Sequence, residues 1–330
     1  METVAMNENT WSGKNVFVTG SSGFLGAWVT EKLIGQGANV VTLLRDDVAR
    51  SYFHLEGLDK KVTTVRGSLE DYLLVERILN EYEIETCFHL AAQTIVGTAN
   101  RSPLSTFESN IRGTWNVLEA ARNSEVMKAM VVASTDKVYG ESTSLPYRET
   151  DRLGAKHPYD VSKACVDMLC SSYFHTYGLS VAITRCGNIF GGGDLNFNRI
   201  VPGTIRSALI KERPVIRSDG KLVRDYVYVE DIADANILLA DTLLRGREKG
   251  EAFNFSLEQP QSVIEVTQKI LSAMNSDLQP IILNQDLKEI NKQYLSSEKA
   301  RARLGWKPKW TFDSGIRKTI DWYKKFINSY

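Results

Sequence analysis

Several kinds of site are hard to build from this sequence, because the residues that they need are scarce. Only four of its 330 residues are cysteine and four are histidine. The cysteines show neither CxxC spacing nor a neighbouring histidine cluster; they are Cys87, Cys165, Cys170 and Cys186. Structural zinc sites need closely spaced ligands of these two types, so we expect free thiols and no metal.

An excess of charge of one sign is also absent, because 40 Lys and Arg balance 40 Asp and Glu. Such a protein has no global field that attracts nucleic acid or an anionic membrane surface, so we expect neither as a partner. No stretch approaches the ~20 apolar residues that span a bilayer. Residues 1–10 lack the basic start and apolar run of a signal peptide, and we therefore expect a cytoplasmic protein.

What the sequence does contain is a regular alternation of strand and helix patterns over its first 190 residues. Apolar, β-branched runs predict strands at 16–19, 40–44, 62–66, 86–90, 130–133 and 181–184. Helical spacing of apolar residues predicts helices at 25–36, 69–82, 104–123 and 160–177. This alternation indicates an α/β fold with a Rossmann-type, doubly wound parallel sheet, because parallel strands need crossover connections.

The alternation stops after the run Gly191, Gly192 and Gly193. Shorter helices are expected at 200–211, 230–242, 263–273, 297–304 and 312–326, with brief strands at 227–229 and 252–255. We expect a dinucleotide-binding domain over residues 1–190, with returning segments from the later chain. A smaller, mixed α/β C-terminal substrate lobe is expected over 191–330.

A glycine loop follows the first predicted strand and opens the first helix. Its G-x-x-G-x-x-G pattern predicts a site for the diphosphate of a dinucleotide at the helix N-terminus. The residues expected there are Gly20, Ser22, Gly23, Phe24, Leu25 and Gly26. Ligands of parallel sheets bind outside the carboxyl ends of the strands, which adds Ser68, Leu69, Leu90, Ala91 and Ala92 to the expected cofactor site.

The end of the second strand leaves the choice between NAD and NADP open. Leu44 stands where an acidic residue often binds the ribose, and Arg45 and Asp46 follow. An Asp accepts a hydrogen bond from the ribose 2′-hydroxyl, whereas an Arg pairs with a 2′-phosphate. We favour NAD and keep NADP as the alternative.

Tyr159 and Lys163 are four residues apart on a predicted helix, so both side chains lie on one face. A nearby ammonium favours a phenolate and would lower the pKa of the Tyr159 phenol toward that of a general base. An isolated pair of this kind is usually an ordinary surface pair, so the rest of the chain has to support a catalytic role.

The motifs together resemble the extended short-chain dehydrogenase/reductases that act on nucleotide sugars, over residues 13–323. They are the glycine loop, residues 89–93 (His-Leu-Ala-Ala-Gln), residues 134–140 (Ser-Thr-Asp-Lys-Val-Tyr-Gly) and the Tyr159 and Lys163 pair. Within this family, residues 185–194 (Arg-Cys-Gly-Asn-Ile-Phe-Gly-Gly-Gly-Asp) are most similar to the CDP-glucose 4,6-dehydratase branch. Residues 219–231 resemble the dTDP-glucose dehydratases and 4-epimerases instead, and Lys292 and Gln293 replace an Arg of the dTDP branch.

The resemblance implies a set of roles for named residues. Tyr159 and Thr135 would handle the sugar 4-hydroxyl, Lys163 would hold the ribose, and Asp136 and Lys137 would eliminate water across C5 and C6. The expected substrate contacts are Gln93, Asn188, Arg199 and Arg224. For Lys137 the alternative is a fixed ion pair with Asp136 or another acid, for Gln93 a structural hydrogen bond, and for Arg199 a solvated surface position.

The function that these roles imply is conversion of an NDP-glucose, with CDP-glucose favoured, to its 4-keto-6-deoxy product. A 4-epimerase of a UDP- or GDP-sugar is the alternative, and it would not need Asp136 and Lys137. A redox-sensing binding protein without catalysis is a third hypothesis, disfavoured by Thr135, Tyr159 and Lys163 occurring together. The helices at 104–123 and 160–177 resemble those of a four-helix dimer contact, with apolar area from Cys165, Val166, Leu169 and Tyr173.

Overall fold

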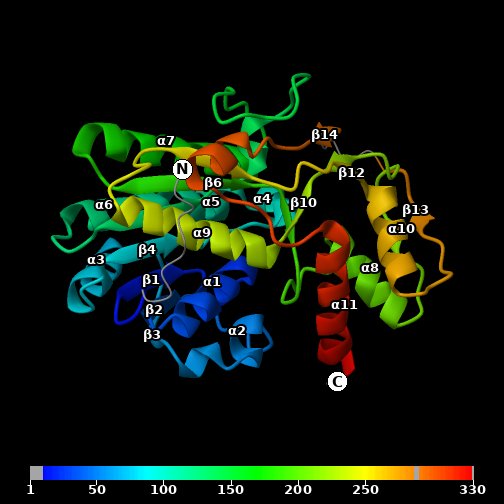
Figure 1. The fold of residues 1–330 in the computed structure, drawn as a ribbon, viewed down its shortest axis with the longest axis horizontal. Coiled ribbons are helices and arrows are strands. Elements are labelled where there is room, and N and C mark those ends of the chain that lie inside the picture. Colours follow the sequence, from blue (N-terminus) through cyan, green and yellow to red (C-terminus); the bar gives the residue numbers. More distant parts are fainter. Residues whose placement is uncertain (1–9, 286–289, 329–330) are drawn as a thin grey trace.

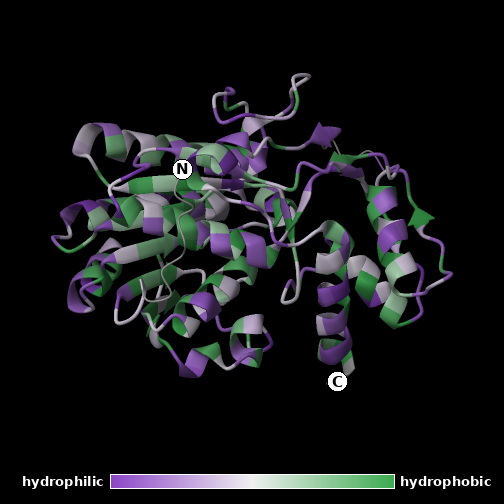
Figure 2. Ribbon diagram, in the orientation of Figure 1, coloured by the Kyte–Doolittle hydropathy of each residue, from purple (hydrophilic) through white to green (hydrophobic). Residues whose placement is uncertain are grey.

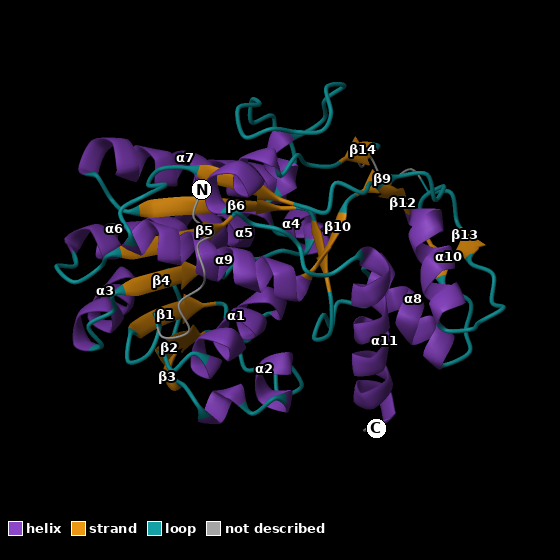
Figure 3. Cartoon of the chain, viewed as in Figure 1, coloured by secondary structure: helices purple, strands orange, loops and turns teal. Residues whose placement is uncertain are grey.

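A seven-stranded parallel sheet forms the centre of the molecule (Figures 1 and 3). The computed structural model describes residues 10–285 and 290–328. The strand order is β11-β6-β5-β4-β1-β2-β3. Their bounds are β1 (Asn15–Thr19), β2 (Asn39–Leu44), β3 (Thr63–Arg66), β4 (Thr86–His89), β5 (Ala129–Ala133), β6 (Val181–Cys186) and β11 (Ala252–Phe255). The predicted Rossmann-type sheet is confirmed, and β11 extends it beside β6 with a strand from the later chain.

Helices cover both faces of this sheet, which explains why its strands are apolar on both sides (Figure 2). Helices α1 (Phe24–Gly35) and α9 (Val229–Leu244) pack on one face, and α3 (Tyr72–Glu81), α6 (Gly113–Asn123) and α7 (Pro158–Tyr177) on the other. Along β5, Val131 packs in the apolar core on the side of α1 and α9. Met130 and Val132 pack in the core on the opposite side, with α3, α6 and α7. Within the described ranges no helix has the length and apolar character that a membrane span requires.

Two of the predicted helices differ from the observed ones. The helix expected at 69–82 begins only at Tyr72, because the Asp71 side chain caps it by accepting a hydrogen bond from Leu74 N. The helix expected at 104–123 is divided into α5 (Pro103–Phe107), a π-helical turn η2 (Glu108–Arg112) and α6. Such π turns frequently occur at functional sites, and this one carries the buried Asn110.

The C-terminal lobe lies beyond the carboxyl ends of the central strands, and it is built from helices and very short strands (Figure 1). Its helices are α8 (Ile200–Leu209), α10 (Val263–Ala273) and α11 (Phe312–Asn328). Its strand pairs join β7 (Asn188–Phe190) to β10 (Tyr226–Tyr228), and β8 (Val215–Ile216) to β13 (Ile281–Ile282). A third small sheet has the order β12 (Gln261–Ser262), β9 (Val223–Arg224) and β14 (Lys292–Gln293). Most of these strands are only two or three residues long, which is too short to give a periodic pattern.

The glycine run at 191–193 is a packing junction between the two parts of the chain. The Trp28 indole of α1 donates a hydrogen bond to Gly192 O at 2.9 Å. A Cβ added at Gly192 would lie 2.5 Å from the Trp322 ring of α11, and one at Gly193 would lie 2.8 Å from Tyr52. Glycine is therefore required at these two positions by the close approach of two aromatic side chains, Trp322 and Tyr52.

We expect Gly192→Ala to lower the free energy of unfolding by about 1–3 kcal/mol, because the new methyl group overpacks the junction at Trp322. Urea denaturation measures the change. Gly35→Ala is the matched control, since its Cβ would meet open space at the end of α1. If the urea midpoint of the Gly192 variant were unchanged, the junction would accommodate the methyl group without loss of stability.

Candidate active site

The carboxyl ends of β1, β4, β5 and β6 open into a cavity of about 1380 Å³ that extends between the sheet and the C-terminal lobe. This is where parallel sheets bind their ligands. A recess of about 600 Å³ along residues 38–41 and 60–63 contains none of the predicted site residues.

The cavity brings together most of the predicted site residues from distant parts of the chain. Those that line it are Gly20, Gly23, Phe24, Leu25, Gly26, Leu90, Ala91, Ala92, Thr135, Asp136, Lys137, Tyr159, Lys163, Asn188, Arg199 and Arg224. The remaining predicted residues are not part of its lining, and these are Ser22, Arg45, Asp46, Ser68, Leu69 and Gln93.

Thr135 starts a tight turn directly after β5, and this turn presents Asp136 and Lys137. The Thr135 hydroxyl accepts a hydrogen bond from Lys137 N at 3.3 Å and donates one to Asp136 Oδ1 at 3.0 Å. The turn continues as a 3₁₀ helix, η3 (Asp136–Tyr139). Asp136 is buried and Lys137 is half-buried, so the strand end holds a carboxyl group and an amino group against one cavity wall.

Tyr159 and Lys163 lie one turn apart at the start of α7, and both are buried in the cavity wall. Their helix is fixed by Ser162, which donates to Tyr159 O at 2.6 Å and accepts from Asn110 Nδ2 at 2.9 Å. Asn110 also accepts a hydrogen bond from Gln93 N at 2.7 Å. The π turn thus connects the loop after β4 to α7 through one buried amide.

Burial dominates the electrostatics of the Tyr159 and Lys163 pair. It raises the pKa of the Tyr159 phenol above its usual value, while Arg199 and a hydrogen bond to Thr135 act in the opposite direction. The prediction that Lys163 lowers this pKa is therefore wrong for the protein without ligands. Burial also lowers the pKa of Lys163 to about 8, although Asp167 opposes this shift. As a base, Tyr159 therefore depends on the charges that oppose burial, such as that of Arg199.

Because Lys163 is buried, we expect its charge to lower the free energy of unfolding, and this penalty depends on pH. Because its pKa falls from 10.5 to about 8, the penalty is full below pH 8 and disappears as the pH rises past 10.5. In the unliganded protein, Lys163→Met should therefore raise the free energy of unfolding at pH 7 by about 3 kcal/mol. Urea denaturation of the variant and the wild type across this range measures the difference. A difference that does not shrink with rising pH would contradict the burial of a charged Lys163.

The glycine loop has the geometry that a diphosphate group requires. Gly20 has a φ of +75°, and a Cβ there would lie 2.8 Å from Ala91 backbone atoms. A Cβ at Gly26 would lie 2.0 Å from Gly20 O, so the helix can start this close to the strand only with glycine. Gly23, the N-cap of α1, supplies no side-chain cap, which leaves backbone N–H groups facing the cavity. These residues fit a dinucleotide cofactor.

The other predicted cofactor residues lie outside the lining of the cavity. Arg45 is exposed, and its guanidinium contacts Asp46 at 2.7 Å and Ser109 at 3.2 Å. Ser68 accepts a hydrogen bond from Glu70 N, and Leu69 O accepts one from Asn116. The contacts that these residues make are therefore with other residues of the protein.

The cavity wall on the side of the C-terminal lobe carries the predicted substrate contacts. Arg199 is paired with the buried Asp194 at 3.0 Å, and Arg224 is buried beside Asn291. Asn188 begins β7, which pairs with β10, and β10 begins two residues after Arg224. Gln93 is not part of the cavity lining, and its Oε1 accepts a hydrogen bond from Ile95 N at 2.7 Å. This is the structural role that was the alternative for Gln93.

A buried ion pair below the active site was not predicted from the sequence. Arg185 of β6 contacts Asp167 of α7 at 2.5 Å, one turn beyond Lys163, and Ser134 donates a hydrogen bond to the same carboxylate. Arg185 also donates to the Tyr139 hydroxyl at 2.8 Å. The network joins the ends of β5 and β6 to α7. Among the residues that the structure describes, no group of His, Cys, Asp and Glu is arranged as a metal site.

Comparison with known proteins agrees with this geometry. The family model described as GDP-mannose 4,6 dehydratase matches residues 17–319. A CDP-glucose 4,6-dehydratase from Salmonella typhimurium is 28% identical, over 98% of this chain and 94% of its own length.

Solved structures include both dehydratases and epimerases. A UDP-glucose 4-epimerase from Thermotoga maritima, solved with UDP-glucose, has a TM-score of 0.88 and 28% identity, and covers 95% of this chain and 99% of its own. A dTDP-glucose 4,6-dehydratase from Streptomyces venezuelae, solved with NAD bound, has a TM-score of 0.85 and 25% identity, and covers 96% and 98%. The fold is therefore shared by two reaction types, and only the side chains of the site can distinguish them.

Proposed function

This chain belongs to the GDP-mannose 4,6 dehydratase family, a group of extended short-chain dehydrogenase/reductases acting on nucleotide sugars, and we propose that it is an NDP-hexose 4,6-dehydratase with CDP-glucose as the favoured substrate. The observation that carries the proposal is the position of Asp136 and Lys137. Both line the same cavity as Thr135 and Tyr159, where an elimination needs a second acid and base.

The first step is oxidation at C4 of the hexose. Tyr159 takes the proton of the 4-hydroxyl, and the neighbouring Thr135 hydroxyl holds the same oxygen by a hydrogen bond. Bound NAD would be held by the glycine loop and Lys163, and it supplies the hydride acceptor for C4 and the hydride donor for C6. The positive charge of Arg199 acts to lower the pKa of the Tyr159 phenol, which favours the proton transfer.

The second step removes water across C5 and C6. A ketone at C4 makes the C5 proton acidic, and the Lys137 amine takes this proton as the C5–H bond breaks. The C6–O bond then breaks, and the Asp136 carboxyl supplies the proton with which the hydroxyl leaves as water. This role requires Lys137 without a tightly bound carboxylate partner. In residues 10–285 and 290–328 its ammonium forms no ion pair and donates to Gln293 Oε1 at 3.3 Å.

The alternative function, a 4-epimerase of a UDP- or GDP-sugar, is supported by the UDP-glucose epimerase among the related structures. An epimerase uses Thr135, Tyr159 and Lys163 but has no task for a buried Asp136 and a cavity-facing Lys137. NAD is the proposed cofactor, because Arg45 is already paired with Asp46 and Ser109. NADP and the cytoplasmic location remain predictions.

The experiment that tests the function is a panel of nucleotide sugars scored by mass spectrometry. CDP-, dTDP-, GDP- and UDP-glucose and GDP-mannose are each incubated with the protein and NAD. We expect one of them, CDP-glucose first, to lose the mass of one water without net consumption of NAD. A product of unchanged mass with inverted stereochemistry at C4 would instead support the epimerase.

We also propose a homodimer formed through α5, α6 and α7. Val166 cannot contribute, because it is completely buried against the sheet, but Leu104, Trp115 and Met168 expose large apolar areas on these helices. Met168→Asp should therefore lower the molar mass measured by sedimentation from that of a dimer to that of a monomer. A wild-type protein that sediments as a monomer would rule the contact out.

A further inference from the structure

Gln293 forms the only hydrogen bond that the described residues offer to the Lys137 ammonium. It ends the short strand β14, about 150 residues after Lys137 in the sequence, and its side chain has no exposed surface. Its Oε1 accepts from the Lys137 ammonium at 3.3 Å, and the residue lines the cavity. Its Nε2 is buried without a hydrogen-bond partner among the described residues. Burying an amide N–H without an acceptor is unfavourable, so this group needs an explanation.

The small sheet around Gln293 places it next to the proposed phosphate site. Gln293 of β14 is the register partner of Arg224 in the parallel pair β14 and β9. Register partners project from the same face of a sheet, so the amide and the guanidinium are neighbours at the cavity wall. An oxygen of a sugar or diphosphate bound there is the acceptor that the Gln293 Nε2 lacks.

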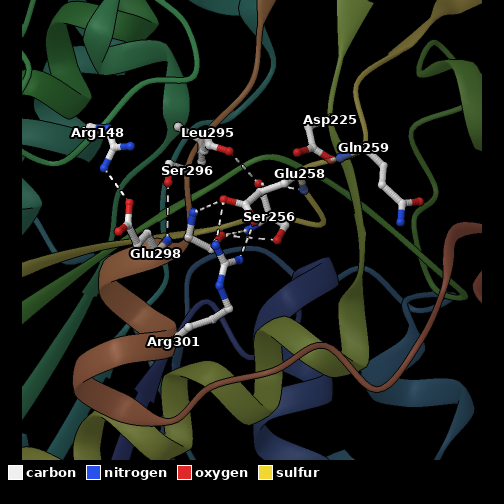
Figure 4. A network of polar contacts seen from close by, with 10 residues as sticks. Arg148, Asp225, Ser256, Glu258, Gln259, Leu295, Ser296, Glu298 and Arg301 are labelled. Carbon is white, nitrogen blue, oxygen red and sulfur yellow. Dashed lines mark hydrogen bonds and ion pairs between the residues drawn. The ribbon is translucent and has the colours of Figure 1, made fainter.

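The segment that carries Gln293 is held firmly on its C-terminal side (Figure 4). Leu295 O accepts a hydrogen bond from Ser256 at 3.1 Å, and Leu295 forms an isolated β-bridge with Tyr147. Glu298 is paired with Arg148 at 2.6 Å. These contacts connect the end of β14 to the loop after η3, so Gln293 and Lys137 are fixed relative to each other.

The chemistry of the amide suits a base that must lose and regain a proton. A carboxylate in this position would stabilise the ammonium and hold its proton. An amide oxygen accepts a hydrogen bond from an ammonium or from a neutral amine, since both carry N–H groups. Its partner is therefore oriented in both protonation states, with the amine lone pair left free to face the substrate.

We propose that Gln293 is a positioning residue for the base Lys137, fixing the direction of the amine without fixing its charge, and that its Nε2 binds an oxygen of the substrate. This inference rests on the proposed dehydratase function. The charged and titratable groups around the position are Asp136 on the same turn, Tyr147 from the following loop, Tyr159 of α7, Cys186 at the end of β6, Arg224 of β9 and the adjoining Asp225. The test below substitutes none of these residues.

The test compares Gln293→Glu with a matched control. The control is Gln261→Glu, because the Gln261 side chain also accepts a hydrogen bond from a lysine, Lys269, at 2.6 Å. Gln261 pairs with Arg224 from the other side of β9, but it does not line the cavity. We expect Gln293→Glu to move the midpoint of the pH–rate profile upward by about one pH unit or more. Dehydration at neutral pH should fall about tenfold or more and recover at higher pH. Incorporation of solvent deuterium at C5 should shift in parallel, whereas Gln261→Glu should keep the wild-type profile.

A second variant keeps the test decisive if the first does not fold. Gln293→Met removes both hydrogen bonds at similar volume, and it should lower kcat and raise KM without moving the midpoint. Superimposable profiles of Gln293→Glu and wild type, or an unchanged rate for Gln293→Met, would overturn the role of Gln293. If the wild type dehydrates no nucleotide sugar at all, the proposed function fails instead.

Discussion

Tyr159→Phe is expected to reduce turnover of the nucleotide sugar by about 10²–10⁴-fold, the usual contribution of a general base. The variant keeps the ring that packs in the wall of the cavity but loses the phenolic hydroxyl that forms a hydrogen bond with Thr135. Steady-state rates with the substrate found in the panel measure the loss. Both the oxidation at C4 and the dehydration should disappear together, because the second depends on the first.

The matched control for Tyr159→Phe lies on the same helix. Tyr177→Phe removes an exposed hydroxyl at the last residue of α7, far from the cavity lining, and should leave the rate unchanged. If Tyr159→Phe retained wild-type turnover, the base for the 4-hydroxyl would have to be another residue.

Lys137→Met should separate the two half-reactions. Loss of the amine removes the base for the C5 proton, so we expect dehydrated product to fall by about 10²–10⁴-fold. Removal of hydrogen from C4 is retained, since Thr135, Tyr159 and Lys163 are unchanged. Absorbance of the reduced cofactor after mixing measures the retained step, and mass spectrometry measures the lost one.

Lys128→Met is the control for Lys137→Met, because Lys128 is an exposed lysine at the opposite end of β5, paired with Glu85. A Lys137 variant with full dehydration activity would assign the C5 proton to another group. A variant that also loses oxidation at C4 would indicate that Lys137 supports the whole site and not one step.

The parts of the site that the sequence predicted are those in which neighbours in space are neighbours in the chain. Tyr159 and Lys163 are one helical turn apart, and the glycine loop is complete within seven residues. Such features follow from local geometry alone. The parallel sheet could be predicted for a similar reason, because each strand and crossover helix has its own pattern of apolar residues.

The parts that could not be predicted depend on contacts between distant segments. Asn110 and Ser162 are 52 positions apart, and Lys137 and Gln293 are 156 apart. The sequence drew attention to Gln293 only as a departure from the dTDP branch, and for Lys137 it offered an acid as the alternative partner. The pKa of Tyr159 was misjudged for the same reason, because spacing along a helix does not reveal how deeply the phenol is buried.

The most direct measurement follows the hydrogen atoms of the substrate. CDP-glucose carrying deuterium at C4 is converted in ordinary water, and the product is analysed by mass spectrometry and NMR. The dehydratase account predicts a product that has lost one water, with the deuterium moved from C4 to C6 and a solvent hydrogen at C5. A product of unchanged mass that still carries the deuterium at C4, with that centre inverted, would contradict it.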